Sequence, residues 1–191
     1  MKIVIGVPVG HFIIPWKFTR SLIDGVLNLV NNGIQVKVLM TEGSYIDDNK
    51  TKLLAKALQH EPDYIIMLDW DHTFDPDDLQ HLYETAKDNN LDLCSGLYFI
   101  DTGYKRPCLI VNGLAYENYP EDSLFEVDTF GAGFSIMSYQ AAKAIYEVEG
   151  YNRIGNWGED VSFCHRAKNV CNFKIWCDSR IKVGHLRFQS I

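Results

Sequence analysis

Two carboxylates follow the most apolar short segment of the chain. Asp69 and Asp71 come directly after residues 64–68, which read Tyr-Ile-Ile-Met-Leu and predict a buried strand. Like charges at the edge of a dry core are unfavourable, because burial and mutual repulsion both disfavour ionisation. Mg²⁺ or Mn²⁺ would relieve that repulsion and bridge the acids to phosphate oxygens. The alternative is a pair of turn-capping acids, the role that we assign to Asp75 and Asp78.

A second acidic pair opens a later helix. Glu159 and Asp160 follow Trp157 and Gly158, and apolar residues at helical spacing come next. The simplest interpretation is a capped helix, since acids stabilise a helix N-terminus. Two acids exceed what a cap requires, and a carboxylate held ionised there is in the state from which a general base starts. Trp157 is either a core residue or an apolar platform for a sugar ring.

One histidine stands where a metal ligand is useful. His185 follows Gly184 at the end of the last predicted strand, and it is either a structural residue or the completion of a metal site. The five cysteines form no CxxC pair and no Cys/His ladder of the kind found in zinc sites. We therefore expect buried free thiols in a reducing compartment.

The first part of the chain supplies regular elements that can position these groups. Continuous apolar strands that alternate with helices predict a parallel sheet covered on both faces, so residues 1–72 are predicted to form a βαβαβ nucleotide-binding half. In such sheets the ligand lies beyond the carboxyl ends of the strands. The predicted strands are 2–9, 34–40 and 64–68, the helices are 16–32 and 48–60, and the ligand edge is 8–11, 41–46 and 69–72.

The pattern loosens in residues 73–191, which we predict to form the acceptor-binding and catalytic half of one α/β domain covering 1–191. Shorter strands with turn-rich connections are interspersed with helices. The predicted helices are 76–89, 139–148 and 159–170, and the predicted strands are 91–99, 108–112, 124–128, 133–137, 173–177 and 181–184.

The composition excludes several functions. Lys and Arg number 18 against 25 Asp and Glu, a net charge of −7, with a pI near 5.3. Such an acidic chain is a poor candidate for nucleic-acid binding, which needs a basic face. No segment approaches the roughly 20 apolar residues of a membrane helix. The N-terminal run reads as a core strand and not as a signal peptide, so we expect a cytoplasmic protein without a membrane span.

Four pieces of the sequence, taken in order, resemble one known family. They are Asp-Trp-Asp at 69–71, Gly-Ala-Gly-Phe at 131–134, Trp-Gly-Glu-Asp at 157–160, and Lys-Ile-Trp-Cys-Asp at 174–178 followed by Gly-His at 184–185. Together they are similar to nucleotide-sugar glycosyltransferases of the GT-A fold, particularly those of glycosyltransferase family 2. The resemblance implies a single Rossmann-like α/β domain. Its central sheet would be mostly parallel with helices on both faces, and a small irregular β region would lie in the second half.

The resemblance also implies roles for the acids and the histidine. Asp69 matches the first acid of the DxD motif, which contacts the ribose and the water shell of the metal. Asp71 matches the acid that coordinates the metal on the donor diphosphate, and His185 matches a further metal ligand. Asp160 matches the acid that deprotonates the acceptor hydroxyl in inverting members, and Glu159 is a candidate contact to acceptor or sugar. The implied cofactor is Mn²⁺ or Mg²⁺.

A donor site follows from the same resemblance. Residues 8–10 and 43–50 match the regions that hold the base and ribose, although the family often has Arg-Asn where this chain has Asn-Lys. The implied donor is a nucleoside-diphosphate sugar, most often of uridine, and the acceptor is a glycan or another hydroxyl compound. The predicted donor-site residues are Pro8, Val9, Gly10, Gly43, Ser44, Asn49, Lys50, Asp69, Trp70, Asp71, Gly133 and Trp157.

Several alternatives stay open. Asp160 lies on a different loop from the predicted metal ligands, which favours inversion over retention. Basic residues at 105, 106 and 187 are either diphosphate or acceptor contacts or solvated surface. Residues 69–73 also fit the DxDxT motif of haloacid-dehalogenase-like phosphatases, with Asp69 as nucleophile and Ser95 as the later hydroxyl. A non-enzymatic sugar or nucleotide binding module is a third possibility. Only six residues follow His185, so we also expect these residues to be the catalytic domain of a longer chain.

Overall fold

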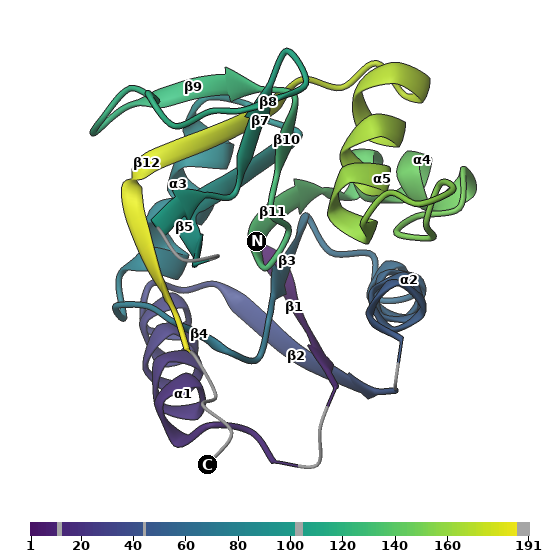
Figure 1. Cartoon of the computed structure of the whole chain (residues 1–191). Helices are drawn as coiled ribbons and strands as arrows, with labels where there is room; N and C mark the ends of the chain where they lie inside the picture. The colour runs from purple at the N-terminus through teal and green to yellow at the C-terminus, as the bar shows by residue number, and fades with distance from the viewer. Residues whose placement is uncertain (11–12, 44, 102–104, 187–191) are drawn as a thin grey trace.

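The structure is a computed structural model that describes residues 1–10, 13–43, 45–101 and 105–186. Its first half alternates strands and helices in the predicted order (Figure 1). Apolar β-branched runs form the strands, and runs with apolar residues at helical spacing form the helices. The elements are β1 (Lys2–Val9), α1 (Trp16–Asn31), β2 (Gln35–Glu42), α2 (Ile46–Leu58) and β3 (Tyr64–Leu68).

The second half contains shorter strands, as the looser sequence pattern predicts. Its elements are β4 (His72–Thr73), α3 (Asp78–Asp88), β5 (Leu93–Asp101), β6 (Lys105–Pro107), β7 (Leu109–Val111), β8 (Leu114–Ala115), β9 (Leu124–Val127), β10 (Thr129–Phe130), β11 (Phe134–Ser138), α4 (Tyr139–Glu147), α5 (Glu159–His165), the π-helix η1 (Arg166–Val170) and β12 (Ile175–His185).

The strands form one large sheet and one small sheet. The large sheet has the order β2-β1-β3-β11-β5-β12-β4, with β6 paired to β5 and β9 paired to β12. β1 is parallel to β2 and β3, and β12 is parallel to β5. The small antiparallel sheet has the order β10-β7-β8. The predicted α/β class is confirmed, with a mixed, mostly parallel central sheet.

One central strand runs against its neighbours. β11 is antiparallel to both β3 and β5, a direction that the sequence pattern did not predict. Phe134, at the start of β11, pairs with Leu68, at the end of β3. The loop that precedes β11 therefore meets the loop that follows β3, which carries Asp69 and Asp71.

Helices cover both faces of the sheet, as predicted (Figure 1). On one face α1 and α3 pack together, and their buried side chains include Phe18, Leu29 and Leu82. On the other face α2 packs against β1 and α4, and Leu53 and Leu54 are fully buried. Each face therefore has its own hydrophobic core, and the sheet between them is rigid enough to fix the side chains at its edge.

The two short strands predicted at 173–177 and 181–184 are wrong, because the structure has one strand there. β12 is continuous, but its pairing with β5 shifts register between Asp178 and Lys182. Such a bulge bends a strand without ending it, and the polar residues at the bend break the apolar pattern. The bend lets β12 reach β4 with its last residues.

The helix predicted over 159–170 is also only partly correct. α5 ends at His165 and continues as the π-helix η1. Within η1, Arg166 is buried, donates to the carbonyl oxygens of Gly150 and Asn152, and pairs with Glu149. Tertiary contacts of this kind stabilise a wide helical turn that apolar spacing cannot reveal. Within the described ranges, no helix is long and apolar enough to cross a membrane.

Candidate active site

The edge of the sheet where β3 ends carries the first acidic motif. The backbone N–H of Asp69 donates to the carbonyl oxygen of Gly133 at 2.8 Å. A methyl group on Gly133 would overlap the side chains of both His72 and Asp69. Glycine is therefore required at this position by the close approach of two side chains. The predicted role of Gly133 in the donor site stays a prediction.

Three potential metal ligands meet at the same edge, and we name Asp71, His72 and His185 the metal cluster. One ligand atom of each lies within 4.8 Å of the others. β4 pairs antiparallel with the end of β12, which sets His185 opposite His72. The backbone N–H of Leu186 donates to the carbonyl oxygen of Asp71 at 2.7 Å. Backbone pairing therefore brings together residues that are more than a hundred positions apart in sequence.

His72 is not among the ligands predicted from the sequence. Its side chain is buried, and Nδ1 lies 2.7 Å from the carbonyl oxygen of Gly133. That oxygen can only accept, so Nδ1 carries the proton and Nε2 carries the lone pair. Nε2 is buried and has no hydrogen-bond partner in the part of the chain that the structure describes. An orphaned lone pair beside Asp71 and His185 is well suited to a metal ion.

Burial and contacts set the protonation of the metal cluster. Burial lowers the pKa of His72, despite the nearby carboxylates of Asp69 and Asp71. The hydrogen bond with Asp71 raises the pKa of His185. Burial alone would raise the pKa of Asp71, but the hydrogen bond with His185 and the charge of that imidazole when protonated outweigh it, so this pKa is lowered. His72 is therefore disposed to stay neutral, the form that binds metals.

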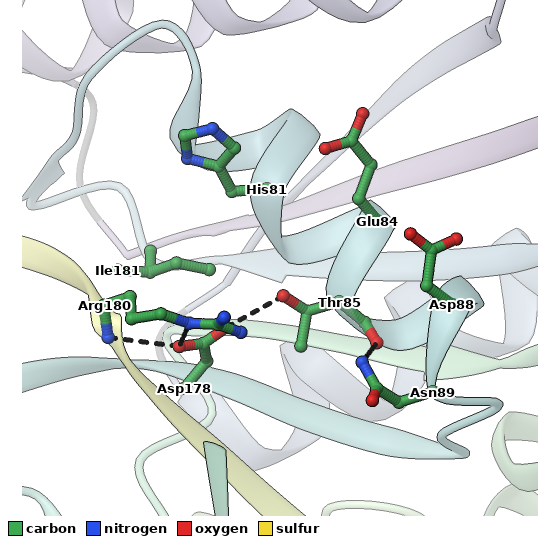
Figure 2. Close-up of a pocket in the computed structure, with 8 residues that line it drawn as sticks. All are labelled: His81, Glu84, Thr85, Asp88, Asn89, Asp178, Arg180 and Ile181. Atoms are coloured by element: carbon green, nitrogen blue, oxygen red, sulfur yellow. Dashed lines mark hydrogen bonds and ion pairs between the residues drawn. The ribbon is translucent and has the colours of Figure 1, made fainter. Parts of the chain in front are cut away.

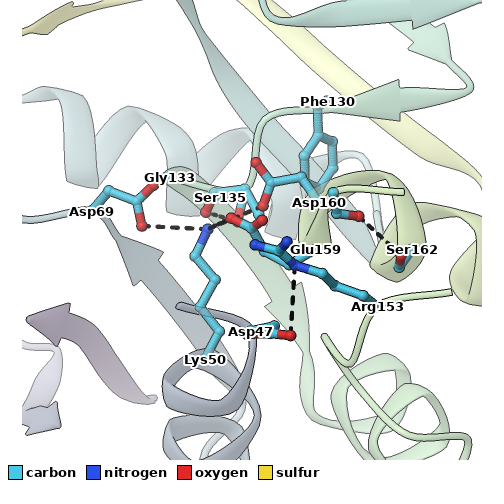
Figure 3. Close-up of polar contacts among 12 residues, drawn as sticks. Asp47, Lys50, Asp69, Phe130, Gly133, Ser135, Arg153, Glu159, Asp160 and Ser162 are labelled. Carbon is cyan, nitrogen blue, oxygen red and sulfur yellow. Dashed lines mark hydrogen bonds and ion pairs between the residues drawn. The ribbon is translucent and has the colours of Figure 1, made fainter. Parts of the chain in front are cut away.

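A buried lysine joins the two acidic motifs, and we name Lys50, Asp69, Glu159 and Asp160 the lysine cluster. Lys50 rises from α2 and points between Asp69 on one side and the two acids of α5 on the other (Figure 3). Its Nζ lies 3.0 Å from Oδ1 of Asp160, 3.3 Å from Oε1 of Glu159 and 3.4 Å from Oδ1 of Asp69. The Lys50 side chain is fully buried.

The carboxylates keep this lysine charged. Burial by itself would lower the pKa of Lys50, because an ammonium group loses hydration. The charges of Asp160, Asp69 and Glu159 outweigh burial and raise the pKa well above its usual range. The cluster therefore contains one fixed positive charge among three acids.

The start of α5 is held by its own hydrogen bonds. The hydroxyl of Ser162 donates to the carbonyl oxygen of Gly158 at 2.9 Å and accepts from the backbone N–H of Ile154 at 3.0 Å. These bonds fix the helix start without using the carboxylates of Glu159 and Asp160. Both acids instead face Lys50, so capping does not account for them (Figure 3).

The predicted nucleoside region lies at the carboxyl ends of β1 and β2. The backbone N–H of Gly43 donates to the carbonyl oxygen of Val9 at 3.3 Å, which joins the two strand ends next to Pro8. Asn49 is buried, and its side-chain amide donates to the carbonyl oxygen of Gly43 at 2.9 Å. Asn49 and Lys50 thus have partners inside the protein, and a nucleoside contact by either side chain stays a prediction.

Two other predicted donor residues lie near this edge, and a third cannot be placed. Trp70 is half-buried, and its indole nitrogen is close to Gly10. Ser44 lies outside the described residues. Both tryptophan and glycine are consistent with a site for a planar base, which also stays a prediction.

A pocket of about 380 Å³ opens beside the acids of α5. Its wall contains Glu159, Asp160 and Arg106, and most of its other lining side chains are apolar. Arg106 lines this pocket, and its contact with an acceptor or a diphosphate stays a prediction. Lys105 is exposed on β6, and Arg187 lies outside the described residues.

Trp157 lies apart from this pocket. Its side chain is 46% exposed, and its ring meets that of His165 edge to face at 5.1 Å. It lines an adjoining pocket of about 460 Å³. The predicted role of Trp157 in donor binding stays a prediction, because none of the predicted strand-end residues lines that pocket.

Another pocket, of about 430 Å³, lies between α3 and β12 and is shown in Figure 2. Its buried acid is Asp178, which accepts hydrogen bonds from the hydroxyl of Thr85 at 2.8 Å and from the guanidinium of Arg180 at 2.8 and 2.7 Å. These internal bonds satisfy the carboxylate at the bulge of β12. We assign this group a structural role.

The phosphatase alternative does not fit the observed strand positions. Ser95 is fully buried near the start of β5, whereas a phosphatase would need its hydroxyl at the carboxyl end of the strand. Glu159 and Asp160 open a helix and do not follow a strand. The hydroxyl and the second acidic pair are thus not arranged around Asp69 as that chemistry requires.

Comparisons with known proteins support the fold. Neither a family model nor a curated protein matches the sequence. Among solved structures, A197 from STIV is similar with a TM-score of 0.66 and 19% identity, over 98% of this chain and 87% of that chain. GalNAc-T7, solved with UDP, GalNAc and Mn²⁺, is similar with a TM-score of 0.68 and 11% identity, over 99% of this chain and 44% of that chain.

At these identities the likeness shows the fold alone, and it supports the GT-A fold that the four motifs predict. The chain spans less than half of the GalNAc-T7 chain. Membership of glycosyltransferase family 2 stays a prediction.

Proposed function

We propose that this chain is a metal-dependent glycosyltransferase that moves a sugar from a nucleoside-diphosphate sugar to a hydroxyl acceptor. The observation that carries the proposal is the orphaned Nε2 of His72, which lies within reach of Asp71 and His185 at the ligand edge of a GT-A fold. A cluster of ligands at that edge has a clear purpose in a transferase, because a departing diphosphate needs a cation beside it.

The donor set of the metal cluster favours Mn²⁺ over Mg²⁺. Two imidazole nitrogens and one carboxylate offer mixed nitrogen and oxygen ligands, whereas Mg²⁺ prefers oxygen ligands alone. Asp71, His72 and His185 would hold the ion, and Asp69 would contact its water shell, as the family resemblance implies. When bound, the ion supplies positive charge to the diphosphate oxygens as the sugar leaves. The presence of Mn²⁺ and UDP in the similar GalNAc-T7 structure motivates the choice of both for this chain.

Asp160 is proposed as the general base. Its carboxylate borders a pocket that is large enough for an acceptor, and it lies on α5, away from the strand ends that carry the metal cluster. In the reaction Asp160 takes the hydroxyl proton of the acceptor. The acceptor oxygen bonds to the anomeric carbon, and the bond from that carbon to the diphosphate oxygen breaks. Attack from the side opposite the leaving group inverts the configuration.

Lys50 has a positioning role in this scheme. It holds Oδ1 of Asp160 and Oδ1 of Asp69 on the same ammonium group, so the base and the first acid of the DxD motif share one anchor. The anchor comes from α2, whose packing in the core fixes its position. The separation between base and donor is therefore set by a rigid helix and not by two surface loops.

Metal-dependent nucleotide binding is the test of the proposal. Melting temperature is measured for the wild-type protein with UDP, GDP, ADP, CDP and dTDP, each with and without Mn²⁺. One nucleotide should raise it, and only when Mn²⁺ is present. The same nucleotide should support hydrolysis of one of its sugar conjugates. An absence of any nucleotide-dependent shift would overturn the proposal.

The role of Asp160 is tested in the same preparation. Asp160→Asn should retain the shift produced by nucleotide and Mn²⁺ but lower hydrolysis and transfer by about 10² to 10⁴-fold, the usual contribution of a general base. Asp24→Asn, which changes an exposed acid on α1, is the matched control and should leave both unchanged. Equal loss of nucleotide binding and turnover in Asp160→Asn would show that the residue is not the base.

A further inference from the structure

The pocket beside Asp160 adjoins a second one, and we name the two together the acceptor groove. The pocket that contains Asp160 and the pocket that contains Trp157 share Ile110, Thr129 and Val161 in their walls. Each has a volume within the roughly 300–1,000 Å³ range of ligand sites. The proposed base and the exposed tryptophan therefore line two adjacent pockets that share part of their walls.

Trp157 gives the far end of the groove an apolar platform. Nearly half of this residue is exposed, so part of its ring surface is open to a ligand. The edge-to-face contact with His165 fixes the ring and leaves exposed surface for a ligand. His165 is one turn along α5 from Val161, so both lie on the same face of this helix. One short helix thus carries the base in its first turn and supports the platform with its last residue.

Polar groups surround the platform. The ammonium group of Lys168 pairs with the carboxylate of Asp128, and the side-chain nitrogen of Asn169 lies 3.1 Å from Nδ1 of His165. The hydroxyl of Thr129 lines both pockets. Because Asp128 and Lys168 neutralise each other, the far pocket offers hydrogen bonds without a strong charge of either sign. A polyanion or a polycation would gain little from such a surface.

This combination matches the chemistry of a neutral carbohydrate. The C–H face of a sugar ring is apolar and packs on an aromatic ring, while its hydroxyl groups need hydrogen-bond donors and acceptors around the rim. We propose that the acceptor is a neutral oligosaccharide. Its reactive unit lies beside Asp160, and its next unit stacks on Trp157. This inference rests on the proposed function, since it assigns the acceptor of the same transferase.

The position of Trp157 predicts a role in acceptor binding and none in the chemical step. A platform in the pocket next to the base contributes to acceptor binding and not to bond breaking. Its loss should therefore raise the KM for longer acceptors and leave turnover at saturation nearly unchanged. The affinity for the donor, which binds at the strand ends in the proposed function, should not change.

Direct binding tests the groove without requiring turnover. Oligomers of glucose, mannose, galactose and N-acetylglucosamine, each of one to four units, are titrated into the protein by calorimetry. At least one series should bind, with higher affinity for two or more units than for one. Trp157→Ala should weaken binding of the longer oligomers about tenfold, as expected for the loss of one stacking contact. Trp16→Ala, which removes another exposed tryptophan on α1, is the control and should bind like the wild type.

The outcomes separate this inference from the function on which it rests. If no oligomer binds, or if Trp157→Ala binds them as the wild type does, the acceptor groove is wrong. The inference is equally wrong if Trp157→Ala loses the melting shift produced by nucleotide and Mn²⁺, since the ring would then belong to the donor site. That shift in the wild-type protein reports on the proposed function separately, whatever the oligomers do.

Discussion

The metal cluster and the lysine cluster lie next to each other, and both contain carboxylates whose negative charge needs a nearby cation. They differ in where that cation comes from. In the lysine cluster, three carboxylates surround an ammonium group that belongs to the chain and is fully buried. In the metal cluster, Asp71 faces two imidazoles, and the buried Nε2 of His72 has no partner among the described residues. The first cluster has a cation of its own, although the buried Oδ1 of Asp69 has no hydrogen-bond partner among the described residues, and the second is suited to an external cation.

This difference teaches how a strongly acidic edge can be stable and still bind a ligand. Without Lys50, the acids that follow β3 and open α5 would repel one another at the end of a dry core. Lys50 offsets one of the three negative charges of Asp69, Glu159 and Asp160 and so reduces their mutual repulsion. Asp71, His72 and His185 are then available to bind the metal ion. Stability and metal binding are therefore expected to separate when each cluster is changed alone.

The largest expected effect comes from removing the buried cation. Lys50→Met keeps the length of the side chain but leaves three carboxylates without their partner, which should lower the free energy of unfolding by about 3–5 kcal/mol. Urea unfolding at pH 7 measures the change. Lys52→Met, two residues along α2, removes an exposed lysine paired with Asp48 and should lower it by less than about 1 kcal/mol. Equal stability of Lys50→Met and the wild type would show that the lysine cluster is not needed for folding.

A smaller loss of stability is expected from a substitution at Gly133, which lies between the two clusters. A methyl group at Gly133 would collide with His72 of the metal cluster and with Asp69 of the lysine cluster. Gly133→Ala should lower the free energy of unfolding by about 1–3 kcal/mol and reduce the melting shift caused by Mn²⁺. Gly158→Ala is the steric control, because the space around that position is open. If Gly133→Ala keeps the full Mn²⁺ shift, His72 does not contribute to the metal site.

Much of this arrangement could be predicted from local sequence, and the rest depends on pairing. The apolar run at 64–68 and the acids after it are a local pattern, so β3 was predicted at the correct residues. The direction of β11 and the continuity of β12 are not local, because register between distant strands decides them. His72 was missed for this reason.

Lys50 illustrates the same limit. In sequence it belongs to an exposed-looking helix start, and only the packing of α2 against the sheet turns it inward. The acids at 69, 71, 159 and 160 could have indicated that a positively charged side chain lies near them. The spacing of the motifs could not say which lysine or arginine supplies it.

The smallest expected effect is a pH dependence that belongs to the metal cluster alone. The raised pKa of His185 gives a stabilising contribution that is fully present below its unfolded value of about 6.5 and is lost as pH rises through the folded pKa. The lowered pKa of Asp71 gives a contribution that is present above its unfolded value, about 4, and is lost as pH falls through the folded pKa. The pair therefore stabilises the metal-free protein most between about pH 4 and 6.5.

His185→Gln should consequently lower the free energy of unfolding near pH 5.5, by less than about 1 kcal/mol because both side chains are partly exposed, and should have almost no effect near pH 8.5. Unfolding in the presence of a chelator at the two pH values measures the difference. Mn²⁺ should reverse the trend, because it binds His185 best when the imidazole has lost its proton. A loss of stability in His185→Gln that is equal at both pH values would mean that packing, and not the Asp71 ion pair, holds this histidine in place.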